Sequence, residues 1–515
     1  MIETSALASP TTRLNAPRAT ASADGQKTVR DSLAVAVAGQ FERVIGILTA
    51  LILRWGLDPS SMGVYSGLRL YLDNTNRTSL GIGLGAVQEI PVLLAAGRRE
   101  EAQRIAQIAY TTNTLTCLAY SALLAGWGFL AWASGPGDIL TTQWNLGLIA
   151  VAALAQIKRY ETFLVAVLRS YREFALTAEL DVFESLASTL AFGLGIWLAG
   201  FWGLLASVAV ILVGKIVYAH ARHPFRFHYE WNGPIAWRLM RVGIPILANT
   251  AVFGAVQQLD RALIFWRLPD PAWAAGLYSV ALLGTSWSLD LAGRLVLVSY
   301  ASFQTTLGRT GSLTQVAHQA IRATEAQAPL LLGISAGAYV LAPAALGWVL
   351  PRYAEGLPAL RPLLPGMVFL ALAWPTRQLL IALGRPYRLC VATGAGLLVA
   401  LLAGLIGADR WGIVGIAWGM SVGYAAVFLA TSGSALLPIL GPACWLAHLA
   451  RLSGWLVLFA TAALAASHVP LVGLTGLGEF VARGLVIAAC VVGVLLVWAA
   501  RHGWGGLFEN RHSPV

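Results

Sequence analysis

The sequence predicts an all-α membrane protein with about fourteen crossings, twelve or thirteen being the alternatives. Of its 515 residues, 57% are hydrophobic and 11% are charged, which leaves too few polar side chains to cover a water-soluble globule of this size. Apolar runs of about 17 to 28 residues recur throughout, each long enough to cross a hydrocarbon layer of about 30 Å. A short segment also recurs in the second half of the chain, which indicates two related lobes.

The predicted membrane spans form two sets of six and a final pair. The first set comprises 33–53, 63–90, 105–133, 142–168, 176–199 and 203–218. The second set comprises 244–266, 276–303, 328–350, 363–383, 389–405 and 411–436. The final pair is 450–466 and 480–499.

These spans predict a domain organisation of two six-helix lobes, at 32–220 and 244–440, followed by two additional helices at 441–500. Residues 1–31 lack the apolar core of a cleaved signal, so we expect a disordered cytoplasmic tail, with a second tail at 501–515. The linker at 221–243 alternates Trp and Met with basic residues. It suits a helix lying in the cytoplasmic interface, and equally a plain basic linker.

The net charge of +11 is distributed unevenly between alternate loops. Roughly twenty basic residues fall on one side of the predicted membrane and about six on the other. Because basic loops stay in the cytoplasm, we expect both termini to be cytoplasmic. The charge then needs no nucleic-acid partner.

The repeated segment begins at Arg54 in the first copy and at Arg267 in the second. Both copies end in Gly-x-Tyr-Ser, as Gly63-Val64-Tyr65-Ser66 and as Gly276-Leu277-Tyr278-Ser279. Six predicted crossings separate the copies, and an even number preserves orientation. The lobes are therefore expected to be parallel repeats, related by an axis along the membrane normal, with a transport pathway between them.

Each copy of the repeat leads into an apolar segment that carries Asp and Arg four residues apart, Asp73/Arg77 and Asp290/Arg294. This spacing places both charges on one face of a helix, and the first segment adds Arg69 on the same face. We expect these faces to line one cationic cavity suited to an anionic cargo, because guanidinium groups match phosphate oxygens. The alternative is that each Asp neutralises its Arg and the pairs only join helices.

Two further pairs of charges occupy comparable positions in the two lobes. These are Glu42/Arg43 in the first predicted span and Asp260/Arg261 in the seventh. Neighbouring residues on a helix point about 100° apart, so each charge is expected to find its partner on another helix. The alternatives are that these residues stabilise the packing of the helices or that they line the cavity.

Asp181 and Glu184 lie one turn apart in the fifth predicted span, and no cation is near them in the sequence. They are therefore candidates for a coupling-ion site. The four cysteines lie in or beside apolar segments without clustering, and nucleotide-binding loops, nucleophile motifs and metal-binding His pairs are lacking. We expect no catalytic residue, no metal, no cofactor and no enzymatic activity.

Several short motifs occur in the order and spacing of a known family. The chain has Leu53-Arg54-Trp55-Gly56-Leu57-Asp58-Pro59 before Gly63-Val64-Tyr65, then Gly97-Arg98-Arg99-Glu100-Glu101-Ala102, then Arg241-Val242-Gly243-Ile244-Pro245, Leu259-Asp260-Arg261 and Gly276-Leu277-Tyr278-Ser279. Over roughly residues 33–436 it resembles the Wzx-type polysaccharide biosynthesis proteins of the multidrug/oligosaccharidyl-lipid/polysaccharide (MOP) flippase superfamily. The second span departs from that family, which is mostly apolar there with a lone Asp.

The resemblance implies a V-shaped pair of six-helix bundles with two extra helices, in the inner membrane of a bacterium. It implies a flippase that moves a polyprenyl-pyrophosphate-linked oligosaccharide by alternating access for exopolysaccharide or surface polysaccharide export. The implied partners are membrane lipid, the lipid-linked glycan, a polysaccharide polymerase and glycosyltransferases. The alternatives are a cation-coupled multidrug exporter of the same superfamily and a membrane-embedded glycan polymerase or ligase, which would need a long periplasmic loop that this sequence lacks.

Overall fold

The structure is a computed structural model that describes residues 45–135, 137–223 and 227–468, with scattered residues between 478 and 493. The side chains of 294–301 are outside this description. All regular secondary structure in the described residues is helical, which confirms the predicted all-α class. The predicted tails lie outside the described residues.

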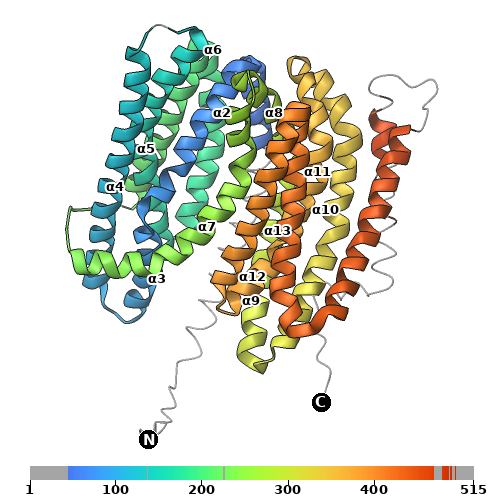
Figure 1. The fold of residues 1–515 in the computed structure, drawn as a ribbon. Coiled ribbons are helices and arrows are strands. Elements are labelled where there is room, and N and C mark those ends of the chain that lie inside the picture. The colour runs from blue at the N-terminus through green and yellow to red at the C-terminus, as the bar shows by residue number, and fades with distance from the viewer. Residues whose placement is uncertain are drawn as a thin grey trace, which may run out of the picture.

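The helices form two bundles side by side, joined by the long helix α7 (Figure 1). The N-lobe contains the helix Ile45–Gly56, α2(Pro59–Asn74), η1(Thr75–Ser79), α3(Ile82–Ala95), α4(Arg99–Ala133), α5(Ile139–Ser170) and α6(Phe174–Arg222). After α7(Gly233–Arg267), the C-lobe contains α8(Pro271–Thr285), α9(Trp287–Thr310), α10(Leu313–Val349), η2(Pro351–Gly356), α11(Leu357–Leu372), α12(Trp374–Ala382) and α13(Pro386–His468).

The outer faces of both bundles are apolar. Trp197, Trp348 and Leu123 are 80%, 85% and 74% exposed, as expected for side chains that contact lipid. Seven described helices are long and apolar enough to cross a membrane, or eight if α2 and α3 form one bent span. The chain is a multi-pass membrane protein. Fourteen crossings remain a prediction, because most of 480–499 lies outside the described residues.

The two longest helices change direction, α6 at one place and α13 at two. The backbone of α6 leaves the helical region at Ala199 and Gly200, between the predicted spans 176–199 and 203–218. Likewise α13 leaves it at Gly412 and Gly441. Gly200 and Gly412 have φ values of +55° and +57°, which glycine adopts without strain. They lie 212 residues apart, so the duplication seen in the sequence extends to the turns inside the lobes.

The second predicted span is broken, not continuous over 63–90. After α2 the chain passes through η1 and through Leu80 and Gly81, both with positive φ, and α3 then continues at 55°. The hydroxyls of Thr78 and Ser79 donate to carbonyls three residues back, at 2.8 and 3.0 Å, a local bonding that competes with the helix. Gly81 also packs on α7, where an added Cβ would lie 2.4 Å from the carbonyl carbon of Gly243.

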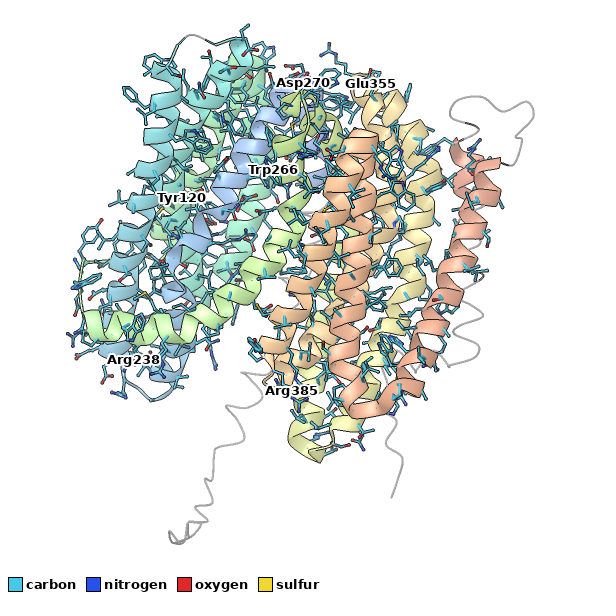
Figure 2. The ribbon with its side chains drawn as sticks, in the orientation of Figure 1. Tyr120, Arg238, Trp266, Asp270, Glu355 and Arg385 are labelled. Atoms are coloured by element: carbon cyan, nitrogen blue, oxygen red, sulfur yellow. The ribbon has the colours of Figure 1, made fainter. Side chains whose placement is uncertain are left out.

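The first part of α7 packs against α3 and runs across the N-lobe helices before the helix turns toward the C-lobe (Figure 1). Arg238 pairs with Glu89 of α3 at 2.7 Å, while Trp237 is 62% exposed. Figure 2 places Arg238 and Arg385 at one end of the molecule and Asp270 and Glu355 at the other. The positive-inside prediction assigns the first end to the cytoplasm.

Candidate functional site

A cavity of about 620 Å³ lies between the lobes. It is bounded by the helix Ile45–Gly56, α2, α5 and α6 on one side and by α8 and α9 on the other. Its charged lining residues are Arg69, Asp73, Lys158, Glu184 and Asp290. The first turn of α9 thus brings Asp290 to the same space as two charges from α2.

Three of the five residues predicted from the repeat therefore line one cavity: Arg69, Asp73 and Asp290. Arg69 and Asp73 form an ion pair of 3.6 Å along α2. The side chain of Arg294 lies outside the described residues. The fifth residue, Arg77, is among the residues that the structure describes, but it does not line this cavity.

Arg77 instead contacts α7 at the break after α2. Its Nη1 donates to Oε1 of Gln258 at 3.4 Å, and the same oxygen accepts from Nδ2 of Asn74 at 2.9 Å. A Cβ added to Gly254 would lie 1.8 Å from Nη2 of Arg77, so the glycine makes room for the guanidinium. Because η1 interrupts the helix, the four-residue spacing no longer places Arg77 on the face of Arg69 and Asp73.

The described part of the cavity lining is zwitterionic. Among the described residues its lining supplies two cations and three carboxylates, together with the aromatic rings of Tyr65, Phe192 and Trp287. Such a lining offers donors for phosphate, acceptors for hydroxyl or ammonium groups, and flat apolar surfaces. Glu184 of α6, which was not among the predicted cavity residues, adds one of these carboxylates.

The two copies of the repeat pack against each other where α2 and α8 begin, at the Asp270 end of the molecule. A Cβ added to Gly63 would lie 1.7 Å from the carbonyl oxygen of Ala272, and one added to Gly276 would lie 1.8 Å from that of Pro59. Only glycine permits this approach. The Gly of each Gly-x-Tyr-Ser motif therefore allows the two lobes to pack closely at this end.

Hydrogen bonds between the lobes reinforce this closure. Nη2 of Arg54 donates to the carbonyl oxygen of Ser279 at 2.7 Å. Nε1 of Trp55 donates to Val349 O at 2.8 Å, and the hydroxyl of Tyr353 donates to Leu57 O at 3.0 Å. Arg54 was not among the site residues predicted from the sequence, although it begins the first copy of the repeat.

Asp181 and Glu184 belong to a group of charges in the N-lobe. Lys215, remote in sequence, ion-pairs with Glu184 and lies 2.8 Å from Glu161 and 3.9 Å from Asp181. Lys158 pairs with Glu161 at 3.1 Å. The two predicted coupling-ion residues therefore have a cation close by, supplied by the second half of α6.

The adjacent charges of the seventh predicted span also differ from the expectation that each pairs with another helix. Asp260 is fully buried, accepts a hydrogen bond from the backbone N–H of Arg261 at 2.7 Å, and lies 3.5 Å from Nε of that residue. The flexible guanidinium reaches back toward its neighbour, which an argument from Cβ directions alone overlooks. Glu42 and Arg43 lie outside the described residues.

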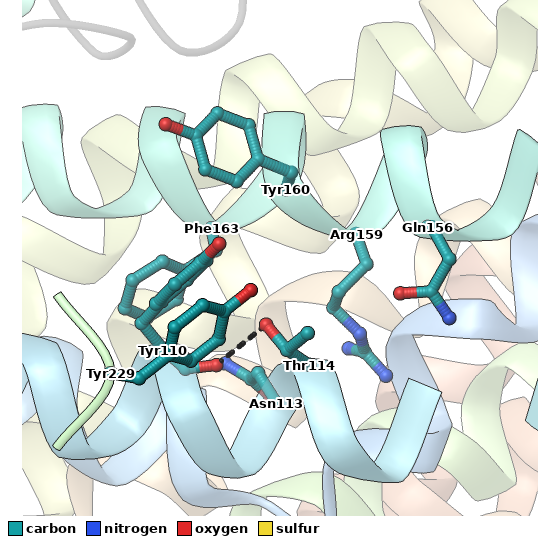
Figure 3. A pocket seen from close by; sticks show the side chains of 8 residues that line it. All are labelled: Tyr110, Asn113, Thr114, Gln156, Arg159, Tyr160, Phe163 and Tyr229. Carbon is teal, nitrogen blue, oxygen red and sulfur yellow. Dashed lines mark hydrogen bonds between the residues drawn. The ribbon is translucent and has the colours of Figure 1, made fainter. Parts of the chain in front are cut away.

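A smaller cavity of about 210 Å³ lies within the N-lobe, between α4, α5 and the segment before α7 (Figure 3). Tyr110, Phe163 and Tyr229 gather at one end and Arg159 and Gln156 lie at the other. The guanidinium of Arg159 donates to the carbonyl oxygens of Thr75 and Asn76 and to the Thr78 hydroxyl. Its Nη1 and Nη2 groups thus hold the end of α2 and η1.

Several solved structures of known proteins share this fold. Neither a protein-family profile nor a curated protein matches the chain. The structure is similar to "Lipid II flippase MurJ, inward closed conformation", with TM-score 0.71 and 12% identity over 91% of this chain and 99% of that one. It is also similar to an inward-facing multidrug resistance MATE family transporter of the MOP superfamily, with TM-score 0.62 and 14% identity over 80% and 95%.

A further similar structure is a MOP superfamily transporter from Pyrococcus furiosus described as having a binding pocket of reversed polarity. It has TM-score 0.53 and 14% identity over 83% of this chain and 95% of that one. At these identities the likeness shows the fold. The chain has the fold of MOP superfamily transporters, and its neighbours in structure are transporters and flippases.

Proposed function

We propose that this protein is a flippase that moves a polyprenyl-pyrophosphate-linked oligosaccharide across the bacterial inner membrane for exopolysaccharide or surface polysaccharide export. The observation that carries the proposal is the inter-lobe cavity that Arg69 and Asp73 of α2 line together with Asp290 of α9. Membrane lipid and the lipid-linked glycan are the proposed ligands. Glycosyltransferases and a polymerase are the proposed partners in the same export process, with both termini of the chain in the cytoplasm.

The zwitterionic lining suits a cargo with two chemical parts. Arg69 and Lys158 supply donors for pyrophosphate oxygens, and guanidinium in particular bonds them in pairs. Asp73, Glu184 and Asp290 supply acceptors for sugar hydroxyls, beside the ring of Trp287. The polyprenyl tail would remain in the bilayer along the apolar outer surface.

The closed contact between α2 and α8 supports alternating access as the mechanism. The glycine crossing and the bonds from Arg54, Trp55 and Tyr353 close the cavity at the Asp270 end. Release at that end requires the two lobes to separate there. The site changes exposure by movement of one lobe relative to the other, as parallel-repeat transporters do.

The test uses a deletion strain of the source organism complemented with variants. We expect Arg69→Gln and Asp290→Asn each to lower surface polysaccharide at least tenfold at normal protein abundance, with the lipid-linked precursor accumulating. The matched control Arg388→Gln removes an exposed charge at the start of α13 and should leave output unchanged. Normal polysaccharide in both cavity variants would refute the proposal.

A multidrug exporter is the second candidate, favoured by the three carboxylates and aromatic rings of the lining, which also suit an aromatic cation. It makes an opposite prediction. The deletion would sensitise cells to lipophilic cationic dyes and leave surface polysaccharide intact. Asp73→Asn and Asp290→Asn would then reproduce that sensitivity, whereas Arg69→Gln would not.

A further inference from the structure

We propose that the ammonium group of Lys215 permanently fills the cation site formed by Glu161, Asp181 and Glu184, so that these carboxylates bind no monovalent cation from solution. These carboxylates therefore do not couple the transport cycle to a monovalent cation. The same holds for either candidate cargo.

Three carboxylates surround the ammonium group of Lys215. Lys215 lies in the second half of α6 and its side chain is 5% exposed. Its Nζ is 2.8 Å from Oε1 of Glu161 and 3.9 Å from Oδ1 of Asp181, and it is in direct contact with Oε2 of Glu184. Oxygen atoms from three carboxylates around one point are the ligands that a hard cation prefers, and here that point is the ammonium nitrogen.

The charges of this group are balanced. Lys158 lies 3.1 Å from Oε2 of Glu161, and Arg169 lies 3.8 Å from Oδ2 of Asp181. With Lys215, three cations therefore match three carboxylates. A buried charge without a partner costs several kcal/mol, so a balanced group gains little from another cation.

The carboxylate group of Glu184 lies between Lys215 and the inter-lobe cavity. Glu184 lines the inter-lobe cavity and its side chain is 40% exposed, whereas Lys215 lies behind it. A cation that entered the cavity would meet Glu184 already paired. Removal of the ammonium group would leave Glu184 open to solution and one negative charge without a partner.

The experiment measures the thermal unfolding of purified full-length protein in detergent, in sodium chloride and in choline chloride at equal ionic strength. The wild type should unfold at the same temperature in both salts. Lys215→Met keeps the length of the side chain without its charge, and its unfolding temperature should rise with sodium in a saturable way, by about 2–5 °C. In the double variant Lys215→Met/Glu184→Gln the sodium response should disappear.

Arg222→Met is the matched control, because it removes a cation from the same half of α6 that pairs with Glu179 outside this group. It should show no sodium response. A folded Lys215→Met protein that is indifferent to sodium overturns the proposal. If that variant does not fold, the comparison of the wild type with Glu184→Gln decides: equal sodium dependence supports the proposal, and a wild-type sodium response that Glu184→Gln removes overturns it.

Discussion

Arg54 donates a 2.7 Å hydrogen bond to the backbone oxygen of Ser279, which lies 225 residues further along the chain and in the other lobe. Its counterpart in the second copy of the repeat, Arg267, instead forms an exposed ion pair with Asp409 at 2.7 Å. Arg54 is 7% exposed. The two copies have therefore diverged, and only the first arginine joins the lobes.

Replacing Arg54 should weaken the closed state. Loss of a buried hydrogen bond from a charged group costs about 1.5–3 kcal/mol, which corresponds to about a tenfold to hundredfold shift toward the open state. We expect Arg54→Gln to raise the rate at which an impermeant maleimide added at the Asp270 side labels Ser286→Cys in the cavity. The measurement requires replacement of the native cysteines.

Arg267→Gln is the matched control, because the same substitution there removes only a solvent-exposed pair of about 0–1 kcal/mol. It should leave the labelling rate unchanged. Equal rates in both variants would show that the bond from Arg54 to Ser279 does not hold the lobes together.

A methyl group at Gly63 should prevent this closure altogether. The added Cβ would lie 1.7 Å from a backbone oxygen of Ala272, and a backbone atom cannot move aside as a flexible side chain does. We expect Gly63→Ala to abolish transport at normal abundance and to label fast in the maleimide assay. Gly126→Ala, in α4 with no atom within 4 Å of its added Cβ, should behave as the wild type.

The sequence was sufficient for the helical class and the duplication, because both depend on apolar runs and on a short motif. It was insufficient for the break after α2. Asn74, Thr75 and Asn76 are polar enough to interrupt a helix, but the bend also depends on the approach of Gly81 to Gly243 and on the bonds from Arg159, which are contacts between distant segments. A helical face drawn through the break therefore misplaced Arg77.

The candidate site was likewise predictable where it depends on local sequence patterns, and not where it depends on contacts between distant segments. The spacing of Arg69 and Asp73, and the repeat that relates them to Asp290, were enough to predict that these residues meet. The counter-charges were not predictable from spacing, because Lys215 lies 31 residues from Glu184, beyond the reversal of α6 at Gly200. For the same reason Glu184 and Lys158 were not predicted to share the cavity with Arg69 and Asp73.

Gly254 should be required for the position of Arg77. A Cβ there would lie 1.8 Å from Nη2 of Arg77, so Gly254→Ala should displace the guanidinium from Gln258. If the contact to α7 is the role of Arg77, then Gly254→Ala and Arg77→Gln should reduce transport to a similar degree, and the double variant should be no worse than either. Polysaccharide output at equal abundance measures this, and additive losses would contradict it.

Arg159 should be one of the main determinants of stability in the N-lobe. Arg159 is 6% exposed, and its guanidinium donates to the carbonyls of Thr75 and Asn76 and to the hydroxyl of Thr78. Each buried acceptor left without a partner costs about 1–3 kcal/mol. We therefore expect Arg159→Met to lower the free energy of unfolding in detergent by about 3 kcal/mol or more. Arg104→Met, which removes an exposed pair with Glu230, should cost no more than about 1 kcal/mol. Similar losses in the two variants would mean that solvent or neighbouring donors replace the guanidinium, and that the bend after α2 does not depend on Arg159.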